Sequence, residues 1–277
     1  YGTPDGPTGE WEHWSTPVAH KPKTGYYDSK SVDTIEKHIK QAKRNGIDAF
    51  ITSWWGPNSF SDEAFEKLLD ISEEMDFKVT IYFELATSKQ DIIEQLSYLY
   101  DKYVESRAFL KLSEKPVIFF YGRVTNKFSQ SDWNYVFSEL ADKGITGSFI
   151  GDGLSSKILN SFDGWHTFNP IDIPVDEALV KYIAASFRAD RQGKLFAATV
   201  IPGYDDKEIR DPGFFKGRNS GQLYQRFWSV AMKSQPNWVL INSFNEWHEG
   251  TEIEPSEEYG DEYLELTREL AEKWKES

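Results

Sequence analysis

Two glutamates three residues apart, Glu246 and Glu249, occupy the part of the sequence best suited to chemistry. The same run, INSFNEWHEGTEIE at 241–254, adds further polar and aromatic side chains: Asn245, Trp247 and His248. Residues 237–242 (NWVLIN) precede it, and their short apolar pattern predicts a buried parallel strand. Active sites of parallel-sheet proteins lie at the carboxyl ends of strands. Cleavage of a glycosidic bond needs two carboxyl groups in different protonation states, so we predict that Glu246 and Glu249 are a catalytic pair.

Two other interpretations of this run are a solvated surface loop and a zinc site. The sequence HEGTE at 248–252 is similar to a zinc helix, but that motif needs a second histidine where this chain has Glu252. Gly250 and the β-branched Thr251 also disfavour a helix. We therefore expect no metal and no cofactor at this position.

Size and composition favour a single domain over residues 1–277 that binds a neutral substrate. The chain of 277 residues carries a net charge of −14, which argues against binding to nucleic acid. Aromatic residues make up 16% of the chain; such rings serve as platforms for sugars, although large cores hold many of them too. No apolar run reaches the roughly 20 residues of a membrane span.

The chain has no cysteine, which excludes disulfides and thiolate sites without fixing the compartment. We favour a secreted or cell-surface location, with a cytoplasmic one as the alternative. The oligomeric state stays open.

Strands and helices are predicted to alternate along the chain. The predicted strands are 47–54, 77–83, 116–121, 147–151, 162–168, 195–201 and 237–242. The predicted helices are 31–44, 62–75, 90–106, 131–143, a short one near 157, 176–192, 221–234 and 261–275. This order predicts an α/β protein with a (β/α)8 TIM-type barrel, whose first strand we expect to be missing before Tyr1. A doubly wound open sheet is the alternative, but no glycine-rich phosphate loop follows any strand.

Polar and aromatic side chains gather at the predicted carboxyl ends of these strands. We predict that they bind substrate, together with Trp14 from a long active-site loop at 1–30. The predicted substrate-binding residues at the strand ends are Trp54, Trp55, Glu84, Tyr121, Trp165, His166, Tyr204, Arg210, Asn245, Trp247 and His248. An oligosaccharide or polysaccharide is the partner that such a set of rings and carboxylates predicts.

The segment SFNEWHEGTEIEP at 243–255 resembles the signature of glycoside hydrolase family 99, whose usual form is NEWHEGTQIEP. Four other segments are similar to that family: WEHW at 11–14, GIDAFITSWWGP at 46–57, FDGWHTF at 162–168 and IPGYDDKEIR at 201–210. The resemblance implies a (β/α)8 barrel that cleaves internal α-mannosidic bonds with retention and without a metal. It also implies that Glu246 takes the proton of the sugar 2-hydroxyl, which attacks the anomeric carbon to give a 1,2-anhydro sugar. Glu249 would then be the general acid/base, with a raised pKa.

The resemblance implies roles for two further residues. Glu84 would lie near the sugar 2- and 3-hydroxyls, and Tyr204 would contact the sugar or the acid. The sequence departs from the family pattern after Glu84, where Leu85 and Ala86 replace Pro-Tyr. It departs also at single positions, which are Trp55 for Tyr, Trp165 where Tyr is common, and Glu252 for Gln. An α-glucan hydrolase and a non-catalytic glycan-binding protein are the alternative functions.

Overall fold

The computed structural model describes residues 12–276 of the chain. Contacts divide these residues into two compact units. The first unit contains the described residues up to Ile47, together with Asn169–Arg188 and the residues from Ala197 onward, and the second contains Asp48–Phe168 and Ala189–Phe196. Trp11 and the rest of 1–11 in the predicted long loop lie outside the described residues, and the single-domain assignment over 1–277 stays a prediction.

The second unit alternates strands and helices as predicted. Its elements are β1 (Ala49–Trp54), α2 (Phe60–Glu74), β2 (Lys78–Phe83), α3 (Lys89–Lys102), β3 (Lys111–Leu112), β4 (Lys115–Phe120), α4 (Gly122–Lys127), α5 (Gln130–Asp142), β5 (Ser148–Asp152), α6 (Ser156–Ser161) and β6 (Gly164–His166). Two elements run from one unit into the other, α7 (Val175–Asp190) and β7 (Leu195–Val200).

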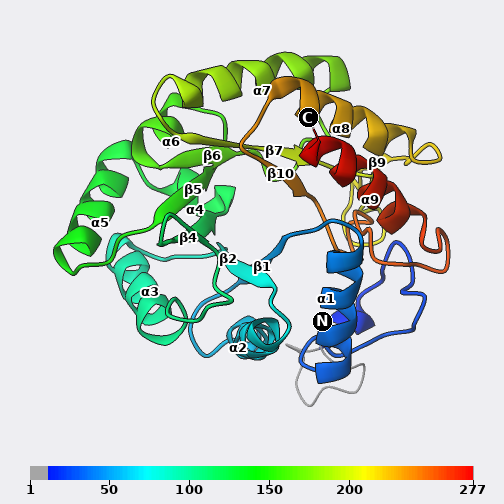
Figure 1. The fold of residues 1–277 in the computed structure, drawn as a ribbon, viewed down its shortest axis with the longest axis horizontal. Coiled ribbons are helices and arrows are strands. Elements are labelled where there is room, and N and C mark those ends of the chain that lie inside the picture. The colour runs from blue at the N-terminus through cyan, green and yellow to red at the C-terminus, as the bar shows by residue number, and fades with distance from the viewer. Residues whose placement is uncertain (1–11, 277) are drawn as a thin grey trace. The chain divides into compact units, whose positions relative to one another are not determined.

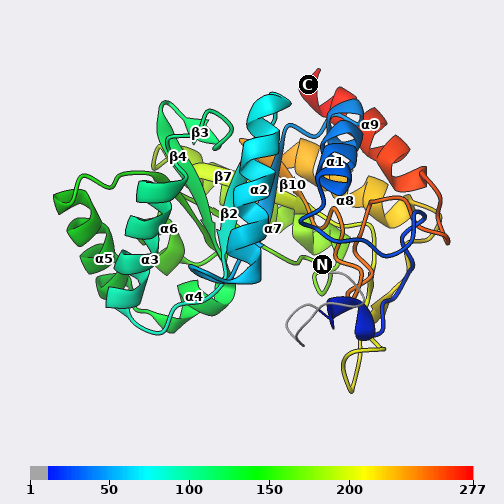
Figure 2. The ribbon, with the colours of Figure 1, turned by 90° about the horizontal axis from the view of Figure 1, so that it is seen from below.

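The first unit combines elements from both ends of the described chain. They are the 3-10 helix η1 (Glu12–Ser15), α1 (Val32–Arg44), β8 (Tyr204–Asp205), β9 (Phe215–Lys216), α8 (Gln222–Ser234), β10 (Trp238–Ile241) and α9 (Glu262–Lys275). Helices α1 and α9 lie side by side in Figures 1 and 2. The turn after α1 needs a glycine, because Gly46 has φ +77° and a Cβ there would lie 3.0 Å from the Cβ of Ala271.

The main sheet has the strand order β1-β2-β4-β5-β6-β7-β10 (Figure 1). The pairs β1–β2, β2–β4, β4–β5, β5–β6 and β7–β10 are parallel. These seven strands are the seven predicted ones, which confirms the predicted α/β class. Within residues 12–276 the strand partner of β10 is β7, with Trp238 opposite Ala197 and Ile241 opposite Val200. The expectation that the last predicted strand pairs on one side is confirmed for the described chain.

Hydroxyl caps explain where several helices begin. The side chain of Ser59 accepts a hydrogen bond from the backbone N–H of Asp62, so α2 starts two residues earlier than predicted. Ser129 and Asp132 form a reciprocal capping box at the start of α5. The elements that the sequence did not predict are short: β3, α4 and the antiparallel pair β8–β9. No helix in the described part of the chain is long and apolar enough to cross a bilayer.

Much of the aromatic content of the second unit is core. Strands β2 and β4 are buried along almost their whole length, and α3 and α5 lie side by side in Figures 1 and 2. The rings between helices and sheet pack at centroid distances of 4.7–6.4 Å, and they belong to Phe120, Trp133, Phe137, Phe149 and Phe162. The 16% aromatic content therefore indicates a well-filled core as much as a sugar platform.

A buried carboxylate joins three aromatic residues of the second unit. Asp62 accepts hydrogen bonds from the Trp54 indole at 2.9 Å and from the Tyr98 and Tyr103 hydroxyls at 2.6 and 2.8 Å. Burial acts to raise the pKa of Asp62, but these donors and the backbone N–H of Asn58 outweigh it and lower that pKa. The charged form of Asp62 is therefore the one that stabilises this unit.

We predict that Asp62→Asn lowers the free energy of unfolding by about 2–4 kcal/mol, because an amide N–H₂ then faces hydrogen-bond donors. The higher free energy of unfolding of the wild type should be fully present above the pKa of Asp62 in the unfolded chain, near 4. It should disappear as the pH falls through the lower pKa of Asp62 in the folded state. Urea unfolding at pH 7 and at pH 3 measures both effects. Asp70→Asn, on an exposed position of the same helix, is the matched control. Equal stability of the two variants at pH 7 would contradict the prediction.

Candidate active site

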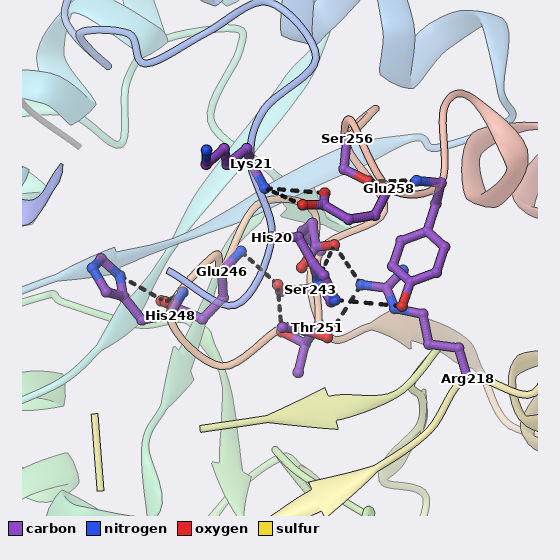
Figure 3. A network of polar contacts seen from close by, with 12 residues as sticks. His20, Lys21, Arg218, Ser243, Glu246, His248, Thr251, Ser256 and Glu258 are labelled. Carbon is purple, nitrogen blue, oxygen red and sulfur yellow. Dashed lines mark hydrogen bonds and ion pairs between the residues drawn. The ribbon is translucent and has the colours of Figure 1, made fainter. Parts of the chain in front are cut away.

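The loop that follows β10 carries Glu246 and Glu249 on one turn. The backbone N–H of Glu246 donates to the Ser243 hydroxyl at 2.8 Å, and that hydroxyl lies 2.7 Å from the hydroxyl of Thr251 (Figure 3). The backbone N–H of Thr251 donates to the carbonyl of Glu246 at 3.3 Å, which closes the turn. Gly250 has φ +58°, and a Cβ there would lie 3.0 Å from the Cβ of Ala19. The turn thus holds both carboxylates on one short segment that only glycine can complete at position 250.

Glu246 is the more exposed of the two carboxylates. Its side chain is 40% exposed, and its Oε1 accepts the backbone N–H of His248 at 3.2 Å. The imidazole Nδ1 of His248 lies 3.5 Å from the same oxygen (Figure 3). The other ring nitrogen, Nε2, lies 2.9 Å from the backbone carbonyl of His13. A carbonyl only accepts, so Nε2 carries a hydrogen and Nδ1 is protonated only in the charged imidazole.

Glu249 is more enclosed, and its surroundings favour the neutral form. Its side chain is 18% exposed, and Nη2 of Arg210 donates to Oε1 at 2.7 Å. Burial raises the pKa of Glu249, the hydrogen bond from Arg210 lowers it, and the charge of Glu246 raises it again, with a net increase. The expected raised pKa of Glu249 is confirmed in direction.

The β8–β9 hairpin positions the cation beside Glu249. Asp206 is buried and receives Nη1 of Arg210 at 2.5 Å, the hydroxyl of Tyr204 at 2.9 Å and the backbone N–H of Phe214 at 2.6 Å. The backbone N–H of Asp205 donates to the carbonyl of Glu249 at 2.8 Å. Burial first, and then the charge of Glu249, raise the pKa of Tyr204, which keeps its hydroxyl a donor. The hairpin therefore fixes both the backbone and the side-chain partners of Glu249.

Tyr27 is a half-buried hub of hydrogen bonds that the sequence did not reveal. Its hydroxyl receives the Asn245 amide and the Trp247 indole, each at 3.0 Å, and donates to Glu254 at 2.7 Å. The Trp14 indole donates to the backbone carbonyl of Tyr27 at 2.7 Å. Trp14 and Trp247 are buried. The donors of Asn245, Trp14 and Trp247 thus bond to Tyr27, and their predicted contacts with substrate stay predictions.

Glu252 anchors the second half of the loop. This buried carboxylate receives Nη2 of Arg218 at 2.5 Å and lies 2.9 Å from Nδ1 of His20. The same Arg218 nitrogen donates to the carbonyl of Gly250 at 3.1 Å. Its guanidinium also lies 4.4 Å from the ring centroids of both Tyr259 and Tyr263. Arg218 therefore connects two points of the loop on either side of Thr251.

The second unit has a polar cluster of its own at the ends of its strands. Ser53 donates to the buried Glu84 at 2.7 Å, and the Tyr82 hydroxyl lies 3.3 Å from Nε2 of His166. Burial lowers the pKa of His166, against the opposing charge of Asp152. The lowered pKa favours the neutral imidazole of His166.

The remaining predicted residues of the second unit differ in exposure. Trp55 is 47% exposed, and the Arg123 guanidinium lies 5.3 Å from its ring and 5.5 Å from that of Tyr121. Trp54 and Trp165 are fully buried. Substrate contacts of all these residues, and the expectation that they share one pocket with Glu246 and Glu249, stay predictions. Among residues 12–276 there is no group of three or more potential metal ligands.

Similar proteins of known sequence carry closely related names. The chain is 27% identical to glycoprotein endo-alpha-1,2-mannosidase of Rattus norvegicus over 92% of this chain and 65% of that protein. It is 28% identical to the Homo sapiens glycoprotein endo-alpha-1,2-mannosidase-like protein, over 91% of this chain and 63% of that one. The chain thus spans just under two thirds of the length of these relatives.

The structure is also similar to a solved one, the GH99 endo-alpha-mannosidase from Bacteroides thetaiotaomicron in complex with BIS-TRIS-propane. The TM-score is 0.90 at 26% identity, covering 100% of this chain and 95% of that one. This likeness confirms the predicted fold class, the TIM-type barrel. The family description "Glycosyl hydrolase family 99" matches residues 18–273, and the chain belongs to that family.

Proposed function

We propose that this protein is an endo-acting glycoside hydrolase that cleaves α-mannosidic bonds with retention, through a 1,2-anhydro sugar. The observation that carries the proposal is the pair Glu246 and Glu249 on one turn, with the first exposed and the second enclosed with a raised pKa. Two carboxyl groups in such different environments suit a base and an acid. The names of the relatives, which are endo-alpha-mannosidases, support the substrate class.

In the first step the Glu246 carboxylate takes the proton of the 2-hydroxyl, whose oxygen attacks the anomeric carbon. Glu249 gives its proton to the glycosidic oxygen, and the bond to the leaving group breaks. The axial 2-hydroxyl of mannose lies anti to an α leaving group, so this displacement inverts the anomeric centre. Water then opens the epoxide with Glu249 as base, while Glu246 returns its proton to the 2-oxygen, and the second inversion gives net retention.

Arg210 and Tyr204 support this division of roles. Arg210 holds one oxygen of Glu249 at 2.7 Å, and its second bond to Asp206 fixes the direction of the guanidinium. The backbone carbonyl of His13 holds the ring of His248 through Nε2. The backbone N–H of His248 donates to Oε1 of Glu246. The acid is thus enclosed by the hairpin, and the base is oriented by its own loop.

Release of reducing ends from α-mannans, with α-glucans in parallel, tests the function directly. We expect new reducing ends from α-mannan and internal rather than terminal products. Release from α-glucan alone would assign another substrate class. Binding without release, with both glutamates intact, would instead favour a non-catalytic glycan-binding protein.

The two glutamates should respond differently to the leaving group. Glu249→Gln should lower kcat by about 10²–10⁴ on an oligosaccharide, because the poor leaving group then departs unprotonated. The loss in the first step should be much smaller on an activated aryl glycoside. Glu246→Gln should reduce both activities alike, because the 2-hydroxyl attack is common to both substrates. Initial rates of the two variants on the two substrates measure this. Glu257→Gln, at an exposed position of the same loop, is the control. If Glu246→Gln is the variant rescued by the aryl leaving group, the roles are reversed.

The intermediate makes a separate prediction. A 2-deoxy substrate lacks the internal nucleophile, so we expect no turnover of it, whichever leaving group it carries. Its binding should persist and can be measured as competitive inhibition of cleavage of the parent substrate. Hydrolysis of the 2-deoxy substrate at the parent rate would show direct attack by a carboxylate instead.

Removal of Arg210 should change the pH profile. Its hydrogen bond and charge oppose the burial that raises the pKa of Glu249. In Arg210→Met we therefore expect a higher pKa for Glu249, which keeps the acid protonated to higher pH. The basic limb of kcat/KM should move to higher pH. Lys207→Met is the control, because Lys207 lies on the same segment but pairs with Asp205 at 3.4 Å. A basic limb that stays in place or moves to lower pH would contradict the assignment.

A further inference from the structure

Two exposed phenylalanines lie at the start of β9, in the β8–β9 hairpin whose Arg210 donates to Glu249. Phe214 is 40% exposed and Phe215 is 57% exposed. The hairpin is firmly held, because Tyr204 pairs with Lys216 and Asp205 with Phe215, and the buried Asp206 caps the N–H of Phe214 at 2.6 Å. Contiguous exposed apolar surface marks binding sites on soluble proteins, and these two adjacent rings form such a surface on a fixed hairpin.

The two rings have different neighbours, although Phe214 directly precedes Phe215, the first residue of β9. The ring of Phe214 lies 5.9 Å from that of Tyr204, whose hydroxyl receives Arg210 at 2.6 Å. Arg210 in turn holds Glu249. Phe214 is therefore on the side of the hairpin that meets the general acid.

Phe215 contacts other residues. It is opposite Asp205 in the strand register, and the Lys207 ammonium lies 4.4 Å from its ring centroid. The Lys207 ammonium also lies 3.4 Å from a carboxylate oxygen of Asp205. The Lys207 ammonium thus already occupies a face of the Phe215 ring. The Phe214 ring instead lies next to Tyr204, which receives Arg210.

We propose that Phe214 is the platform for the leaving-group sugar, stacking the apolar face of the residue on the reducing side of the cleaved bond. The proposal rests on the proposed function, in which Glu249 protonates the glycosidic oxygen. A general acid must lie within hydrogen-bond reach of that oxygen, so the sugar attached to it extends on the side of Glu249 that the hairpin occupies. A ring exposed there covers an apolar sugar face, while Arg210 and Tyr204 provide polar contacts next to it.

The test compares two substrates that share the same non-reducing part and differ in leaving group. One is an α-mannan oligosaccharide with a sugar leaving group, and the other is the corresponding α-glycosyl fluoride, whose leaving group is a single atom. We expect Phe214→Ala to lower kcat/KM on the oligosaccharide on the order of tenfold, the effect of losing one aromatic contact, and to leave the fluoride rate unchanged. Phe214→Trp should retain the oligosaccharide rate. Phe215→Ala, at the more exposed position of the same hairpin, should match the wild type on both substrates.

Binding of the released product sugar, measured by calorimetry, gives a readout without turnover. Phe214→Ala should weaken it about tenfold, and Phe215→Ala should not. If the wild type cleaves the oligosaccharide and Phe214→Ala has the same kcat/KM on both substrates, Phe214 is not the sugar platform, and the proposed function stands. Equal losses on oligosaccharide and fluoride would show a structural role for Phe214 and also overturn the platform. A wild type that neither cleaves nor binds α-mannosides would overturn both proposals.

Discussion

Four glutamates within the nine residues from 246 to 254 repel one another, and the loop after β10 depends on giving each its own partners. Glu252 receives Arg218 and His20, and Glu254 receives Tyr27 and His38. Glu249 receives Arg210, and Glu246 keeps its backbone donor and its contact with water. Buried carboxylates without such donors would take up protons or unfold the loop. The carboxylates at 252 and 254 thus both have buried donors, while Oε2 of Glu252 is buried without a hydrogen-bond partner in the described part of the chain.

Because each carboxylate of the loop has different donors and a different degree of burial, neighbouring carboxyl groups acquire different proton affinities. A guanidinium next to a carboxylate normally holds its pKa down. At Glu249 enclosure by the hairpin and the charge of Glu246 exceed that effect. The raised pKa of Glu249 therefore comes from burial and from the charge of Glu246, and Arg210 limits the increase. Such opposition allows a proton affinity to be tuned by small changes in the distance between Arg210 and Glu249.

The seven strands of the main sheet and the fold class could be predicted from the sequence, and so could the turn that carries the candidate pair, because each has a local signature. Apolar runs bounded by turns identified all seven strands, and the polar turn after 237–242 identified Glu246 and Glu249. Short elements such as α4 and the β8–β9 hairpin have too few residues for a periodic pattern. Trp54 and Trp55 show a second limit, since adjacent residues at a strand end differ between full burial and 47% exposure. Tyr27 could not be identified, because its partner Glu254 is 227 residues away in the chain.

That separation bears on how the chain folds. The bonds of Tyr27, His38 and His20 to the loop join residues that are 216–232 apart in sequence, so each closes a very long loop of chain. Contacts of such sequence separation form late, after the more local contacts of the second unit. At ribosomal rates of about 5–20 residues per second, the segment containing Tyr27 leaves the ribosome roughly 10–50 s before its partners exist. During that interval Trp14, Tyr26 and Tyr27 are aromatic surface with nothing yet to bury them, and a chaperone that binds exposed rings would find its site there. The residues that complete the catalytic loop are thus also the ones that wait longest for it.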